Sequence, residues 1–121
     1  DYQFKELYVS TLNQSDIDTA NQMGYNPEAV KFQYDFLNDG YEKLPDGLRK
    51  AIEESRQIII LMNPPYGTSS TSAGNHKEGT SLTKTNELMN TEKLGRGSQQ
   101  LYAQFLYKLH ISGAKSNLLL L

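Results

Sequence analysis

The ten residues Ile58–Gly67 constrain the fold more than any other stretch of this chain. They begin with an apolar run, Ile58–Met62, which is too short for a membrane helix and is typical of a strand buried on both faces. The two prolines that follow have no backbone N–H and therefore cannot continue a central strand. The sequence predicts a buried strand that ends in a rigid, extended tetrapeptide, Asn63–Tyr66.

The rest of the chain predicts an alternation of strands and helices. Strands are expected at residues 7–12, 29–34, 58–62 and 117–121, with Asp35, Phe36 and Leu37 closing the second strand. Helices are expected at residues 15–23, ended by Gly24, at 48–54, and from the cap Ser98 to the stop Gly113. This order favours an α/β fold with a mainly parallel sheet, right-handed crossovers and flanking helices.

Residues 67–97 differ from their surroundings because they contain few apolar side chains and no clear periodicity. We expect a long, polar and flexible loop over residues 68–97. Its positive charges are Lys77, Lys84, Lys93 and Arg96. A lid that becomes ordered around substrate DNA is a compatible alternative.

Composition narrows the class of protein. The 121 residues are enough for one domain with a modest core, and the net charge of −2 gives no global basic field for nucleic acid. The chain has no cysteine, and His76 and His110 lie far apart in sequence, so we expect no disulfide and no metal site. No apolar run approaches the about 20 residues of a membrane span, and we expect a soluble, cytoplasmic chain without membrane contact.

The motif Asn63-Pro64-Pro65-Tyr66 after an apolar strand resembles that of S-adenosylmethionine-dependent amino-methyltransferases, in particular the N6-adenine DNA methyltransferases. The resemblance implies that these four residues are catalytic. The side-chain oxygen of Asn63 and the carbonyl of Pro64 would accept the two N–H bonds of the target amine and localise its lone pair toward the methyl sulfonium. Tyr66 would stack on the adenine after it leaves the duplex.

The same resemblance implies S-adenosylmethionine as cofactor and DNA as substrate, in a restriction-modification type of system. Asp35 would accept a hydrogen bond from the cofactor adenine, and Phe36 would lie against its ring. Thr11 is the residue nearest to the position where an acidic side chain would hold the ribose.

Two parts of that family's pattern are missing from the 121 residues: the glycine-rich Phe-x-Gly-x-Gly segment and the later strands. We therefore expect an interior fragment of a larger methyltransferase, inactive alone, with a partial Rossmann-like class I fold that lacks its first and its C-terminal strands. The first strand would lie between the strands at 7–12 and 58–62. Without it, the chain must close the gap, borrow a strand from another copy in a homo-oligomer, or leave edges unpaired.

Two other functions remain open. Enzymes that methylate glutamine N5 or an RNA base share the tetrapeptide, because their targets are also planar amines. Alternatively, the chain is a non-catalytic nucleic-acid-binding or assembly module. A glycine-rich cofactor motif just upstream of Asp1 would favour the enzyme, whereas a natural start codon there would favour the module.

Overall fold

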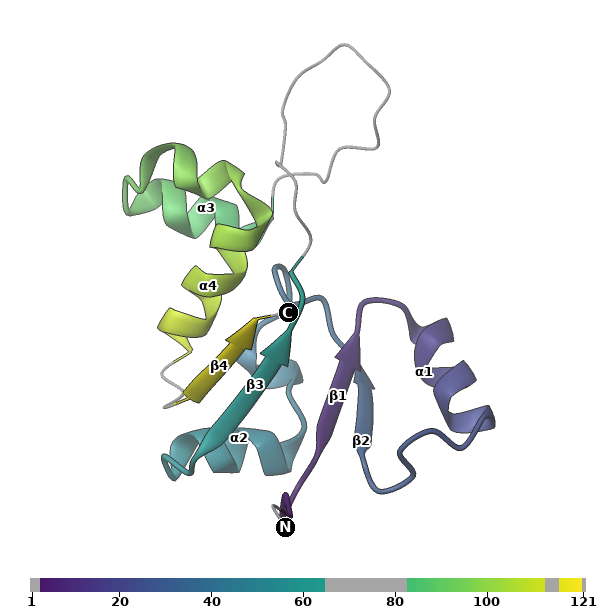
Figure 1. Ribbon diagram of the computed structural model, residues 1–121. Helices are drawn as coiled ribbons and strands as arrows, with labels where there is room; N and C mark the ends of the chain where they lie inside the picture. The colour runs from purple at the N-terminus through teal and green to yellow at the C-terminus, as the bar shows by residue number, and fades with distance from the viewer. Residues whose placement is uncertain (1–2, 65–82, 113–115, 121) are drawn as a thin grey trace.

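The computed structural model describes residues 3–64, 83–112 and 116–120 (Figure 1). These residues contain four short strands and four α-helices, which alternate except that the last two helices follow each other. The strands are β1 (Tyr8–Thr11), β2 (Val30–Gln33), β3 (Ile58–Met62) and β4 (Ser116–Leu120). The α-helices are α1 (Gln14–Gln22), α2 (Asp46–Glu53), α3 (Lys84–Thr91) and α4 (Leu101–Ile111). Two 3-10 turns, η1 (Tyr41–Lys43) and η2 (Gly95–Gln99), complete the described elements.

The strands form two parallel pairs. β1 pairs with β2, with Tyr8 opposite Val30, and β3 pairs with β4, with Ile58 opposite Ser116. Figure 1 shows the strands in the order β2, β1, β3, β4, with their carboxyl ends at the same edge. The predicted α/β class with parallel strands is confirmed. The single continuous sheet is not found in the described part of the chain, because β1 and β3 belong to separate sheets.

The boundaries of several elements agree with the sequence analysis. β3 has the predicted bounds, and α1 ends just before Gly24, whose φ of +67° is the left-handed conformation that stops a helix. The helix expected from residue 15 begins one residue earlier, at Gln14, and Asn13 occupies its N-cap position.

The expectation that β3 is buried on both faces was wrong. Ile59 and Leu61 are 48% and 62% exposed, whereas Ile58 and Ile60 on the opposite face are half-buried. A strand has two faces, and only one of them is covered here. The second predicted strand also ends earlier than expected, because Asp35–Leu37 leaves the ladder and enters a turn.

The expected loop at residues 68–97 was wrong from residue 84 onward, where α3 and η2 are found. The hydroxyl of Thr83 caps α3 by accepting a hydrogen bond from the amide of Asn86 at 3.0 Å. Ser98 is not a helix cap; it lies buried in η2, and α4 begins at Leu101. Residues 68–82 and the predicted stop Gly113 lie outside the described residues.

Buried polar side chains join α3, η2 and α4. Gln104 of α4 is fully buried; it accepts from the Thr83 hydroxyl at 2.6 Å and donates to the Ser98 carbonyl at 2.7 Å. Asn86 of α3 donates to the same carbonyl. This polar network, defined by Thr83, Asn86, Ser98 and Gln104, holds the three elements together where apolar side chains are scarce. None of the helices in the described ranges has the length and apolarity needed to cross a bilayer.

Candidate functional site

Three of the predicted site residues follow the carboxyl ends of parallel strands. Thr11 ends β1, Asp35 comes two residues after β2, and Asn63 directly follows β3. These ends share one edge of the molecule (Figure 1). In open α/β sheets, ligands bind outside the carboxyl ends of strands. This edge is therefore the candidate site.

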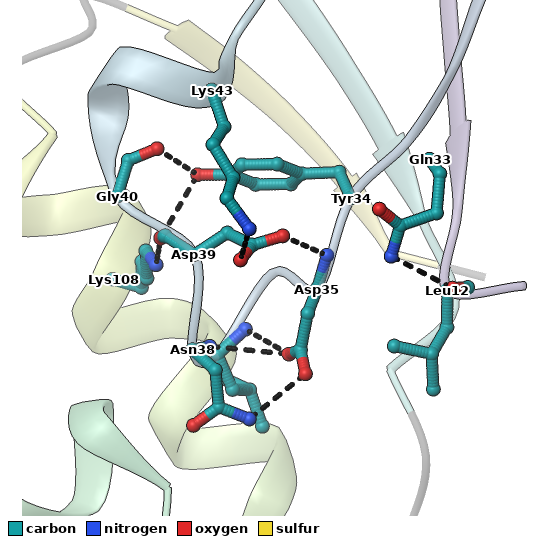
Figure 2. Close-up of polar contacts among 10 residues, drawn as sticks. Leu12, Gln33, Tyr34, Asp35, Asn38, Asp39, Gly40, Lys43 and Lys108 are labelled. Atoms are coloured by element: carbon teal, nitrogen blue, oxygen red, sulfur yellow. Dashed lines mark hydrogen bonds and ion pairs between the residues drawn. The ribbon is translucent and has the colours of Figure 1, made fainter.

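Asp35 organises the turn that follows β2 (Figure 2). Its Oδ1 accepts from the amides of Leu37 and Asn38 at 3.2 and 3.1 Å, and its Oδ2 accepts from the Asn38 side chain at 2.9 Å. These local bonds explain why the chain turns here instead of extending β2. A carboxylate offers about four lone-pair positions, so this geometry leaves room for one more donor.

Asp39 closes the same turn from the other side. Its Oδ2 accepts from the Asp35 amide at 2.8 Å, and its Oδ1 forms an ion pair with Lys43 at 2.5 Å. The hydrogen bond from Lys43 holds the pKa of the Asp39 carboxyl below its usual value, against the opposing effect of burial. Asp35 and Asp39 thus form an acidic, internally bonded loop, which we call the Asp35 turn and define as residues 35–40.

Tyr34 lies beneath the Asp35 turn and is only 6% exposed. Its hydroxyl donates to the carbonyl of Asp39 at 3.2 Å (Figure 2). Burial, with smaller contributions from Asp39, Glu42 and Asp35, raises the pKa of Tyr34 to about 12. The phenol therefore stays neutral and keeps its hydrogen to donate at physiological pH.

Phe36 sits within the turn and stacks on Phe105 of α4. The two ring centroids are 4.9 Å apart and the planes differ by 5°. Tyr34 meets Phe36 edge to face, with centroids 6.1 Å apart. Both are favoured arrangements for aromatic pairs. They fix the orientation of the Phe36 ring.

Lys108 of α4 also contacts this turn. Its ammonium donates to the Asp39 carbonyl (Figure 2) and lies 5.7 Å from the Tyr34 ring centroid and 5.8 Å from that of Phe36. Burial lowers the pKa of the Lys108 ammonium, and the negative charges of Asp35 and Asp39 partly oppose this effect. A charged group is thus held between two aromatic rings and an acidic loop.

The N-terminal turn of α3 attaches to the same loop. The amide and the hydroxyl of Thr85 both donate to the Leu37 carbonyl, at 3.2 and 2.7 Å. The amide of Lys84 donates to the Asn38 side-chain oxygen at 3.0 Å. The Asp35 turn is therefore bonded to elements more than forty residues further along the chain.

The structure brings together only some of the residues that the sequence singled out. Asp35 and Phe36 lie in the turn that follows β2 and not at the end of the strand, where they were expected. The Thr11 hydroxyl donates to Asp16 at 3.0 Å, so its hydrogen is already used within α1 and β1. Asn63 is exposed and Pro64 is buried at the end of β3, and the other two catalytic candidates, Pro65 and Tyr66, lie outside the described residues.

Several residues of this site were missed by the sequence analysis, namely Asn38, Asp39, Lys43, Phe105 and Lys108. The spacing of Asp39 and Lys43 is a local signal for an ion pair, and an aspartate followed closely by asparagine favours a turn. Phe105 and Lys108 carry no such signal, because their contact with residues 34–39 depends on tertiary structure.

Within the described ranges, no three acidic or histidine side chains gather closely enough to hold a metal ion. Comparisons with protein-family models, curated proteins and solved structures gave no match to this chain. The chemistry of the site therefore rests on its own residues. Among the described residues it offers a carboxylate that uses three of its about four acceptor positions, a fixed aromatic ring in the same turn after β2, and an exposed amide directly after β3, on the other side of β1 (Figure 1).

Proposed function

We propose that the chain belongs to the catalytic domain of an S-adenosylmethionine-dependent N6-adenine DNA methyltransferase with a Rossmann-like fold. The observation that carries this proposal is the position of Asn63, which is exposed directly after a parallel strand and is followed by a buried proline. An amide at that point can accept from an amine that approaches the carboxyl edge. The neighbouring proline keeps the backbone of Asn63 extended.

The Asp35 turn supports the cofactor half of the proposal. One acceptor position of Asp35 remains for the amino group of the cofactor adenine, and the Phe36 ring lies beside it. The order β2, β1, β3, β4 with parallel strands is also compatible with a Rossmann-like sheet that receives one more strand between β1 and β3. Methyl transfer is then a direct displacement in which the protein positions the amine and activates its lone pair.

The proposal predicts a specific loss of catalysis in the full-length enzyme that it implies. Asn63→Ala removes the side-chain acceptor and should lower methyl transfer to adenine by about two to three orders of magnitude, in line with the loss of one transition-state hydrogen bond. Asn63→Asp keeps an acceptor oxygen and should retain much more activity. Transfer of a labelled methyl group to DNA measures the rate, and calorimetry measures cofactor affinity, which should stay close to that of the wild type.

Asn21→Ala is the matched control, because Asn21 is an exposed asparagine in α1, away from the carboxyl edge. It should leave both measurements unchanged. Near-normal turnover by Asn63→Ala would remove the central claim. Methyl transfer to a glutamine-containing peptide or to RNA, with none to DNA, would move the assignment to those related amino-methyltransferases.

A further inference from the structure

Helix α4 presents two side chains, one turn apart, to the loop that follows β2. Phe105 stacks on Phe36, and Lys108 donates to the carbonyl of Asp39. Both contacts converge on the loop that we propose to bind the adenine of the cofactor.

The Phe105 contact limits where a planar ligand can approach Phe36. A ring inserted between two stacked rings needs the outer centroids to be about 7 Å apart, twice the usual stacking distance. The observed separation is 4.9 Å. A planar ligand therefore meets the edge or the opposite face of Phe36, and Phe105 acts as a rigid backing.

The Lys108 contact continues through a chain of hydrogen bonds to Asp35. Lys108 binds the carbonyl of Asp39, and the carboxylate of Asp39 accepts from the amide of Asp35. The amide of Asp39 donates in turn to the carbonyl of Asp35 at 2.7 Å. These bonds connect the Lys108 ammonium to Asp35, the residue that would accept from the adenine.

A lysine at this place has an energetic cost, which argues against a merely space-filling role. Burial disfavours its charged form, whereas Asp35, Asp39 and Glu42 favour it. A methionine would fill a similar volume without this cost. It could not donate to the Asp39 carbonyl.

We propose that Lys108 is a positioning residue that fixes the Asp35 turn and thereby sets its affinity for an adenine ring. The identity of the ligand in this inference rests on the proposed function. The effect of Lys108 on the turn is independent of that function. Phe105 supports the same role by holding Phe36 from behind.

The test compares Lys108→Met and Lys108→Arg with Lys50→Met, which removes an exposed lysine from α2. Two quantities are measured by NMR on the 121-residue chain: amide hydrogen exchange at Leu37, Asn38 and Asp39, and the response of these amides to millimolar adenosine. Lys108→Met should speed exchange and weaken adenosine binding, each by about tenfold, because a charge-assisted hydrogen bond is lost. Lys108→Arg keeps a donor, so its amide exchange and its adenosine binding should stay close to those of the wild type. Lys50→Met should change neither the exchange nor the binding.

Wild-type exchange and binding in Lys108→Met would overturn the inference. A wild-type chain whose turn ignores adenosine would instead contradict the proposed cofactor site and the adenine half of the inference, while the exchange rates would still decide whether Lys108 fixes the turn. If Lys108→Met does not fold, Phe105→Leu is measured in the same way. It should likewise loosen the turn, and an unchanged turn in that variant would count against the role of α4.

Discussion

Tyr34 shows how one buried residue links the core to the candidate site. Its ring packs against Phe32 and Phe36, and its hydroxyl supports the carbonyl of Asp39. Because its folded pKa of about 12 lies above the ordinary value of 10.0, the folded state holds the phenol hydrogen more tightly than the unfolded state does. The stability that Tyr34 provides is therefore complete below pH 10.0 and is lost as the pH rises through about 12.

This linkage predicts an alkaline titration of Tyr34. Tyrosinate absorbance of the wild-type chain should contain a component near pH 12 that disappears in Tyr34→Phe. The associated loss of unfolding free energy is about 2–3 kcal/mol, from about 1.4 kcal/mol per pKa unit. Tyr25→Phe, which removes an exposed ring, serves as the control and should leave this component in place. Identical curves for Tyr34→Phe and the wild type would contradict the assignment.

At this scale the sequence predicts residue types at the site better than their hydrogen bonds. The position of Asp35 after a strand follows from local pattern. The three hydrogen bonds that its carboxylate accepts within the turn do not follow from that pattern. The same residues could continue the strand or form a turn, and their sequence does not decide between the two. The same holds for Thr11, whose hydroxyl finds a nearer partner in Asp16.

Helices α3 and α4 with η2 form a unit whose buried side chains are mostly polar, with Met89 and Leu101 as the buried apolar ones among the described residues. Thr85 is buried along with the polar network, and each of these side chains has a hydrogen-bond partner. Satisfied networks of this kind rigidify a structure, whereas a single unsatisfied member is costly. The unit is thus specified by hydrogen-bond geometry more than by apolar burial.

Removing the central member of the polar network should destabilise the unit. Gln104→Leu deprives the Thr83 hydroxyl of its acceptor, and we expect a loss of about 2 kcal/mol in unfolding free energy. Chemical denaturation measures this loss. Gln22→Leu, at an exposed position in α1, should have little effect. Adding Thr83→Val to Gln104→Leu should lower the stability further, because Thr83→Val also removes the cap of α3. Equal stability of Gln104→Leu and Gln22→Leu would refute this account.

The polar side chains buried in α3 also explain why the sequence did not predict α3, whereas it did predict α4. Leu101, Phe105, Leu106 and Leu109 repeat at helical spacing and indicate one apolar face. In α3, the buried positions are Thr85, Asn86 and Met89, which give almost no apolar periodicity. The cap at Thr83 was the available local signal.

In the whole molecule, two separate parallel pairs leave one edge of β1 and one edge of β3 without a strand partner in the described ranges. The side chains beside these edges include Val9, Ile59 and Leu61, all of them exposed. Near the amino ends of these two strands, Arg56, which precedes β3, forms an ion pair at 3.5 Å with Glu6, which precedes β1. The two segments that lead into β1 and β3 therefore lie close together. Within the described residues, the gap between β1 and β3 is not closed by direct pairing.

Unpaired apolar edges promote association between chains. We therefore predict that the isolated 121-residue chain associates as its concentration rises, and that Ile59→Lys combined with Leu61→Lys shifts it toward the monomer. Sedimentation velocity across a concentration series measures the effect. Met23→Lys adds a charge at an apolar position that is 63% exposed, away from both edges, and should not have this effect. A wild-type chain that stays monomeric throughout the series would contradict the prediction.

The polar network also bears on how the molecule responds to temperature. The buried side chains of the described residues include five polar and six apolar ones. Exposing apolar surface raises the heat capacity on unfolding, and exposing polar surface lowers it. The buried polar side chains therefore reduce the heat capacity of unfolding, so the curve of stability against temperature should be shallower than with apolar side chains at these positions. Cooling would then weaken this fold less than it weakens one of the same size with a purely apolar interior.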